Sequence, residues 1–158
     1  LLVAPPRAPY ADTYAATAAA IDVASHEAPL YPGEDGPART AALLVALARW
    51  ESVFDPRVTG RDWSGESYGL YQVHASNLAR LHVTAEELAD PLTSSRVALA
   101  LLRESLRVCR ARPAREQLGH YASGGPTCDV PEGLEASRRR VALAERLFRR
   151  KPPRWTSR

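Results

Sequence analysis

The sequence predicts a mainly α-helical domain, and three observations support this fold class. Apolar residues recur at helical spacing along most of the chain, 45 % of the residues are hydrophobic, and only nine of the 158 are glycine. A chain of this length forms one domain with a sizeable core and has no room for two full domains. We expect an extended leader at 1–9, the domain at 10–150 and a flexible basic tail at 151–158.

The first helix is predicted to start at Asp12 or Thr13, either of which can cap it, and to run through about Ala24. Its inner side is predicted from helical spacing as Tyr14, Ala18, Ile21 and Ser25. A loop rich in proline and glycine follows at 28–37.

The second helix is predicted to begin near Thr40, with Pro37 in its first turn. It must stop by Asp55, because the residue before Pro56 is pushed out of helical geometry. The helix is apolar nearly all round, so we expect it to be buried in the core. The residues predicted to be buried are Leu43, Leu44, Val45, Leu47 and Trp50.

Turn residues separate short β-capable pieces at 57–72, which predicts a small hairpin or an irregular loop. Ser76 is predicted to cap a helical turn that ends at Leu81. Thr84 and Glu87 have the spacing of a capping box for another turn, which ends before Pro91.

Three further helices are predicted in the C-terminal half. The longest runs from 91 to about 111, with one side formed by Ala98, Leu101, Leu102, Ser105, Leu106 and Cys109. Pro113 breaks it, and a helix over 111–122 follows, ended by paired glycines. The last helix spans about 132–150 and presents a face of arginines to solvent. Its predicted buried residues are Leu134, Val141, Ala144, Leu147 and Phe148.

A carboxylate closes the apolar stripe of the second helix. Leu44, Leu47, Ala48 and Glu51 stand at i, i+3, i+4 and i+7. Burial and the negative end of the helix dipole both disfavour an ionised carboxylate and raise its pKa. A carboxylic acid that is still protonated near neutral pH can act as a general acid. Glu51 is therefore the candidate catalytic residue, and the alternative is a helix-terminal surface residue.

Three short motifs follow one another along the chain: ESVFDP at 51–56, SYGLYQV at 67–73 and YASG at 121–124. In this order and spacing they resemble the soluble lytic transglycosylases and the goose-type lysozymes, and the resemblance covers 40–125. It implies a lysozyme-like helical fold with a small β-hairpin or irregular loop after the catalytic helix. It also implies a cleft for a glycan strand of alternating N-acetylglucosamine and N-acetylmuramic acid.

The resemblance assigns a role to each matching residue. Glu51 would be the single catalytic acid/base, and the hydroxyl of Tyr121 would reach Glu51 or the sugar and hold the carboxyl in orientation. Ala122 stands where the family has Asn, and the stretch from Glu51 to Gly69 is long for the family, which leaves a subsite role for Thr59 open. The residues implied to line the sugar subsites are Ser67, Gly69, Leu70, Tyr71 and Gln72.

The chemistry leaves three functions open. A hydrolysing lysozyme needs a second carboxylate roughly 5 to 9.5 Å away, for which Asp62 and Glu66 are the candidates. Without one, Glu51 can act twice, and the peptidoglycan lytic transglycosylase that results would leave 1,6-anhydro ends without using water. A non-catalytic wall-binding or assembly module is the third alternative, and Ala122 favours it. We expect no cofactor for either the lysozyme or the transglycosylase.

Two cysteines, Cys109 and Cys128, lie 19 residues apart and are suited to a single disulfide or to two buried thiols. A disulfide over such a loop would contribute on the order of 3 kcal/mol and would place the protein outside the cytoplasm. His120 is the single histidine near either cysteine, which is too few ligands for zinc. We expect a disulfide and no metal.

The two ends of the chain differ in charge. Residues 1–55 carry three arginines and seven acids, whereas 103–158 carry fourteen basic residues and six acids. A basic surface attracts polyanions, although a solvated helical face explains it equally well. Aromatic residues are not interleaved with the basic run, so we expect the partner to be peptidoglycan strands and not nucleic acid.

Nothing in the sequence predicts a membrane anchor. No apolar run approaches the roughly 20 residues of a membrane span. The opening LLVA resembles the end of a removed signal peptide. We expect a monomer that is periplasmic or secreted in the bacterial cell envelope.

Overall fold

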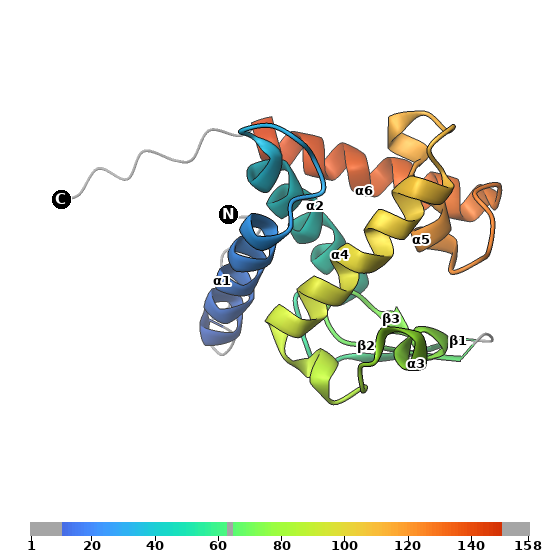
Figure 1. The fold of residues 1–158 in the computed structure, drawn as a ribbon. Coiled ribbons are helices and arrows are strands. Elements are labelled where there is room, and N and C mark those ends of the chain that lie inside the picture. Colours follow the sequence, from blue (N-terminus) through green and yellow to red (C-terminus); the bar gives the residue numbers. More distant parts are fainter. Residues whose placement is uncertain (1–10, 63–64, 150–158) are drawn as a thin grey trace.

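The computed structural model describes residues 11–62 and 65–149, so the predicted leader and tail lie outside the described residues. Within these ranges the chain is mainly helical, with one small sheet (Figure 1). The α-helices are α1 (Ala11–Glu27), α2 (Gly36–Glu51), α3 (Leu78–Leu81), α4 (Pro91–Val108), α5 (Gly119–Ser123) and α6 (Pro131–Arg149). Single 3-10 turns are η2 (Ala75–Asn77), η3 (Glu87–Ala89) and η4 (Ala114–Glu116). The predicted fold class is confirmed.

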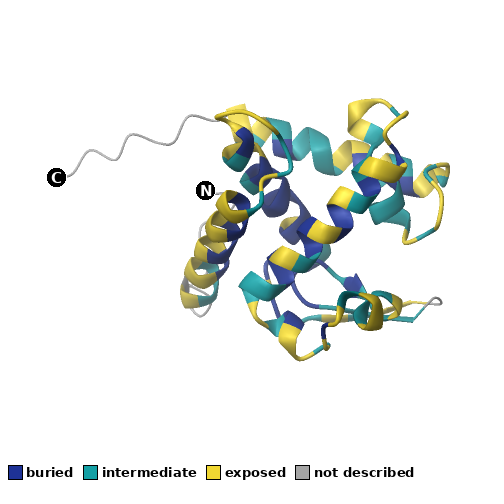
Figure 2. Ribbon diagram, in the orientation of Figure 1, coloured by how far each residue is buried: buried dark blue, intermediate teal, exposed yellow. Residues whose placement is uncertain are grey.

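Helix α2 forms the centre of the core, with α1 and α6 packed against it. Its residues from Ala42 to Ala48 are all buried, and Figure 2 shows this burial concentrated along α2. The prediction of a buried helix is confirmed, except that Trp50 is 53 % exposed. Trp50 lies in the last turn, next to the exposed Arg49.

A three-stranded antiparallel sheet follows α2 and lies at the opposite end of the molecule from α6 (Figure 1). Its strands are β1 (Thr59–Asp62), β2 (Gly65–Tyr68) and β3 (Val73–His74). Thr59 pairs with Tyr68 between the first two strands, and Ser67 pairs with His74 between the last two. Of the two predicted alternatives the hairpin is correct, and β3 adds a third strand to it.

The start of α1 and one residue of its inner side differ from the prediction, whereas Ile21 and Ser25 are buried as predicted. The helix already includes Ala11, so Asp12 and Thr13 lie within it and are not its caps. Ala18 is exposed, whereas Thr17 and Ala24 are buried. Alanine occupies every side of this helix, so the hydrophobic pattern contains too little contrast to define the inner face.

Turn chemistry was predicted correctly at one of two sites. The Thr84 amide donates to Glu87 Oε2 at 2.8 Å and the Glu87 amide donates to Thr84 Oγ1 at 3.2 Å, which confirms the capping box. At the other site His74 is the cap, because its side chain accepts a hydrogen bond from the Ser76 amide. Ser76 is therefore inside η2 and does not cap it.

The C-terminal helices also differ in length from the prediction. Helix α4 ends at Val108, and the helix predicted over 111–122 is divided into η4 and α5. Helix α6, with 19 residues, is longer than α4, with 18. Phe148, predicted to be buried, is 40 % exposed. Gly124, with φ of 64°, ends α5 as predicted.

Candidate active site

Glu51 is the last residue of α2, and the turn that follows it is held from two sides. The Ser52 hydroxyl contacts two carbonyl oxygens, that of Ala48 at 3.1 Å and that of Leu70 at 2.9 Å. Val53 and Phe54 then take positive φ angles of 52° and 66°, which no helix allows. The helix therefore ends abruptly, and Glu51 is held at a defined place at its end.

The side chain of Glu51 forms an ion pair with Arg140 of α6. Arg140 Nη2 lies 2.5 Å from Glu51 Oε1, and the two side chains are only 13 % and 16 % exposed. Sequence reasoning missed Arg140, because the arginines of the last helix were all predicted to face outward. A signal was present: Ser137, Arg140 and Ala144 stand at helical spacing on one side of α6.

The pKa of the Glu51 carboxyl is raised above its ordinary value. Burial raises it, and the Arg140 guanidinium lowers it by a smaller amount. The predicted direction is thus confirmed, and burial is its main cause. A carboxyl group in this state can carry a proton at a higher pH than an exposed glutamate can.

Tyr121 of α5 lies close enough for its hydroxyl and the Glu51 carboxyl to interact electrostatically. Burial raises the pKa of Tyr121 well above its ordinary value, and the charge of Glu51 raises it further. The hydroxyl donates to the Tyr71 carbonyl oxygen at 2.9 Å, and the Tyr121 amide donates to Ser105 Oγ at 3.0 Å. Tyr121 therefore connects α4 and α5 to the turn at 69–72.

That turn consists of four of the five residues predicted to line the sugar subsites, and these four lie in different surroundings. Leu70 and Tyr71 are 0 % and 1 % exposed, and the Tyr71 hydroxyl lies 3.1 Å from Ser95 Oγ. Both side chains therefore belong to the core. Gly69 has φ of +73°, and a Cβ there would lie 2.6 Å from the Leu88 carbonyl oxygen, so only glycine fits.

The amide of Gln72 is used within the protein. Its Nε2 donates to the Val58 carbonyl oxygen at 3.2 Å and to the Gly69 carbonyl oxygen at 3.0 Å. An amide nitrogen has two hydrogens, so the side-chain oxygen is the part of Gln72 left to accept from a ligand. Ser67 lies on β2 opposite Gly60 and is partly buried.

The two candidate second carboxylates lie on the hairpin. Glu66 Oε1 accepts from Arg61 Nη2 at 2.8 Å, and Glu66 Oε2 accepts from the Tyr68 hydroxyl at 2.5 Å. The hydrogen bond from Tyr68, together with the charge of Arg61, lowers the pKa of Glu66. Asp62 is the last residue of β1 and is exposed. A catalytic role for either stays a prediction.

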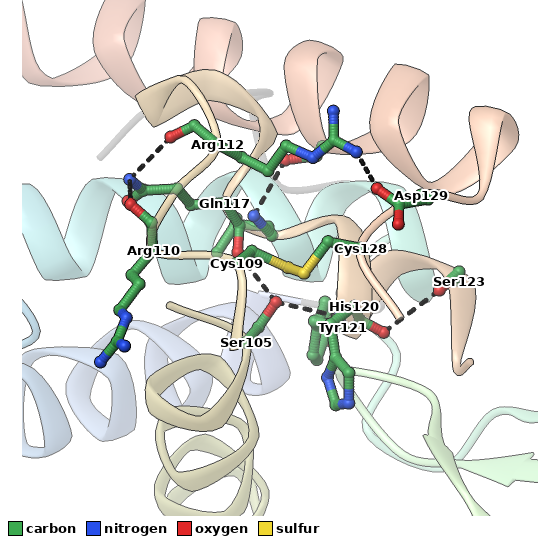
Figure 3. The surroundings of a disulfide bond; sticks show 12 residues. Ser105, Cys109, Arg110, Arg112, Gln117, His120, Tyr121, Ser123, Cys128 and Asp129 are labelled. Atoms are coloured by element: carbon green, nitrogen blue, oxygen red, sulfur yellow. Dashed lines mark hydrogen bonds and ion pairs between the residues drawn. A yellow bond between two sulfur atoms is a disulfide. The ribbon is translucent and has the colours of Figure 1, made fainter. Parts of the chain in front are cut away.

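A disulfide between Cys109 and Cys128 fixes the segment that carries Tyr121, as predicted. Figure 3 shows this bond between the end of α4 and the loop before α6, and α5 belongs to the segment of the chain that the bond closes. Ser105 of α4 accepts from the Tyr121 amide and donates to the Gln117 carbonyl oxygen at 2.9 Å. An ion pair between Arg112 and Asp129 lies beside the disulfide (Figure 3).

A family model for the transglycosylase SLT domain matches residues 34–129. This range is more than half of the chain, and it includes Glu51, the turn at 69–72 and Tyr121. The chain belongs to this family. No curated protein and no solved structure matches it. The SLT match ends before α6, so Arg140 lies outside it.

Membership of the SLT family supports a lytic transglycosylase-type function that acts on peptidoglycan, outside the cytoplasm. In 11–62 and 65–149 no helix combines the length and the apolar character needed to cross a lipid bilayer. The same residues contain no group of three His, Cys, Asp or Glu side chains that could hold a metal ion.

Proposed function

We propose that this SLT domain is a lytic transglycosylase that cleaves the β-1,4 bond between N-acetylmuramic acid and N-acetylglucosamine. Glu51 is its single acid/base. The observation that carries the proposal is the burial of Glu51 at the end of α2, with its pKa raised. Such a carboxyl can give a proton, which the first half of the reaction requires, and can then take one back, which the second half requires.

The reaction balances with Glu51 alone. Protonated Glu51 gives its proton to the glycosidic oxygen, the bond from that oxygen to C1 breaks, and C1 gains oxocarbenium character. The Glu51 carboxylate then takes the proton from the C6 hydroxyl of the muramic acid, while O6 forms a bond to C1. The products are a free hydroxyl on one strand and a 1,6-anhydro end on the other, and Glu51 is protonated again.

We place the sugars beside the turn at 69–72 and beside Ser67. In this assignment Gly69 lets the glycan approach the backbone, and the Gln72 side-chain oxygen accepts a hydrogen bond from the sugar. Leu70 and Tyr71 support the turn from the core, and Tyr121 holds it through the Tyr71 carbonyl oxygen. Tyr121 thereby supports catalysis through the turn and through its closeness to Glu51.

We further propose that the protein works as a monomer in the periplasm or as a secreted protein of the bacterial envelope. The disulfide supports this location, because disulfides persist in oxidising compartments. Its substrate is the glycan strand, and no step in the mechanism requires a metal or an organic cofactor.

A hydrolytic lysozyme is the second candidate, and one observation favours it. Glu66 has a lowered pKa, so it stays ionised when Glu51 is protonated. An ionised carboxylate and a protonated one are the pair that water-using glycosidases employ. In this alternative Glu66 or Asp62 would act as the nucleophile or the base.

Mass spectrometry of the muropeptides released from purified peptidoglycan tests the proposal. The wild-type chain and Glu51→Gln are compared, because the substitution keeps the shape and removes the transferable proton. Anhydro products that disappear in the variant support the transglycosylase. Hydrated products that disappear in the variant indicate the lysozyme, and no product from either chain indicates a binding module, for which Ala122 is the relevant departure from the family.

A further inference from the structure

Arg140 differs from its neighbours on α6 in burial and in its partner. Arg138 pairs with Glu116 and Glu135, and Arg139 pairs with Glu135, with side chains 45 % and 62 % exposed. Exposed pairs of this kind are largely solvated and contribute little to stability. Arg140 is 13 % exposed and pairs with the catalytic candidate Glu51.

The guanidinium of Arg140 is largely removed from water. Its Nη1 is buried and has no hydrogen-bond partner among the described residues. A guanidinium that is removed from water needs a counter-charge, and in this structure the counter-charge is the Glu51 carboxyl at 2.5 Å. The pair also joins α2 to α6, two helices that pack against each other.

We propose that Arg140 is a positioning residue of the reaction, which acts through Glu51 by fixing its carboxyl and stabilising the ionised form. The proposal rests on the proposed function. Ionised Glu51 is the product of the first proton transfer and the base of the second. A cation 2.5 Å away therefore favours the state between the two half-reactions.

Two other groups bear on the same carboxyl. Tyr121 faces it from α5, and Tyr71 acts on Tyr121 in turn. The pKa values of both tyrosines are raised, so both stay neutral in the range where Glu51 titrates. Arg140 is thus the charged group whose removal changes the titration of Glu51.

The sign of the effect follows from these contacts. Removal of the guanidinium removes the influence that lowers the pKa of Glu51, so the pKa rises further. Because the first step needs protonated Glu51, the alkaline limb of kcat/KM should move to higher pH in Arg140→Met. Turnover at the optimum should fall roughly 10-fold to 100-fold, since the carboxyl loses the group that fixes its place.

The pH profile is measured for the wild type, Arg140→Met, Arg140→Lys and Arg139→Met. Arg140→Lys keeps the charge and should keep the alkaline limb close to that of the wild type. Arg139→Met removes an exposed arginine of the same helix and should leave the profile unchanged. If the Arg140→Met profile has the same alkaline limb as the wild type, Arg140 is a structural residue and the proposal is wrong.

A carboxyl 13C NMR titration tests the proposal without using activity, with Glu51→Gln to assign the Glu51 signal. A titration midpoint that is higher in Arg140→Met than in the wild type supports the proposal, and equal midpoints overturn it. Arg140→Gln is measured in the same way if Arg140→Met does not fold. Since the titration needs no substrate, a failure of the proposed function appears in the muropeptide experiment and is separate from this result.

Discussion

Two Arg–Glu pairs of similar geometry behave in opposite ways in this protein. The shortest N–O distance is 2.5 Å in the Arg140–Glu51 pair of α6 and α2, and 2.8 Å in the Arg61–Glu66 pair of the hairpin. The pKa of Glu51 is raised, whereas the pKa of Glu66 is lowered. An arginine partner therefore does not by itself decide the proton affinity of a carboxyl group.

Burial accounts for the difference. Glu51 is 16 % exposed, and the cost of removing its charge from water outweighs the attraction of Arg140. Glu66 is 37 % exposed, so its hydrogen bonds with Tyr68 and Arg61 dominate. The first carboxyl is suited to proton transfer and the second to remaining ionised.

The largest difference between the two pairs is expected in kcat when each carboxyl is replaced in turn by an amide. Glu51→Gln should lower kcat by about 10²-fold to 10⁴-fold, the usual contribution of a general acid/base. Glu66→Gln should change kcat less than about 2-fold, because the transglycosylase mechanism does not use it. Release of muropeptides is the measurement for both. A large loss in Glu66→Gln, together with hydrated products, would make Glu66 the second carboxylate of a lysozyme.

Removal of the two arginines compares the pairs in stability. Arg140→Met leaves a largely buried carboxyl without its partner. Because this carboxyl can take up a proton, the free energy of unfolding should fall by roughly 1 to 3 kcal/mol. Arg61→Met opens an exposed pair and should leave the urea midpoint unchanged within error. The double variant Glu51→Gln, Arg140→Met should regain part of the loss, and an equal or larger loss would show that Arg140 stabilises the fold independently of Glu51.

The disulfide joins the end of α4 to the loop before α6, on the side of the molecule that contains the Arg140–Glu51 pair, and the hairpin has no such bond. Cys109→Ser with Cys128→Ser should lower the free energy of unfolding by about 3 kcal/mol, because the loop it closes gains freedom in the unfolded chain. Urea unfolding with and without a reducing agent measures this for the wild type. If the double serine variant and the reduced wild type are both as stable as the oxidised protein, the bond has no stabilising role.

The smallest effects are expected when the hydroxyl of Tyr121 or of Tyr68 is removed, since each substitution deletes one hydrogen bond. Tyr121→Phe leaves the Tyr71 carbonyl oxygen without its donor and should cost about 1 to 2 kcal/mol of stability. Tyr68→Phe removes the donor to Glu66 Oε2, so a 13C titration should find the pKa of Glu66 raised. A Tyr121→Phe variant of unchanged stability with a large loss in kcat would place its hydroxyl on the substrate instead.

The location of the catalytic candidate Glu51 could be predicted from the sequence because the signal is local. The apolar stripe of α2 ends at Glu51, Pro56 prevents its continuation, and one helix is enough to predict a buried carboxyl. Turn residues likewise predicted a hairpin or an irregular loop, of which the hairpin is correct, and two cysteines allow a single disulfide. The ends of α1 and α4 were less well predicted, since the apolar pattern there contains too little contrast to define a boundary.

What the sequence by itself determined is the mainly helical fold, the family and Glu51, because periodicity, turn chemistry and motif order are properties of neighbouring residues. Tertiary structure alone decided that Arg140 pairs with Glu51 and that the side chains of Leu70 and Tyr71 enter the core. Consecutive residues on a helix are about 100° apart, so Arg138 to Arg140 cannot all face solvent in the same direction. The helical spacing of Ser137, Arg140 and Ala144 indicates which of them turns inward. That Arg140 meets Glu51 there depends on where α6 lies against α2, which is a long-range contact.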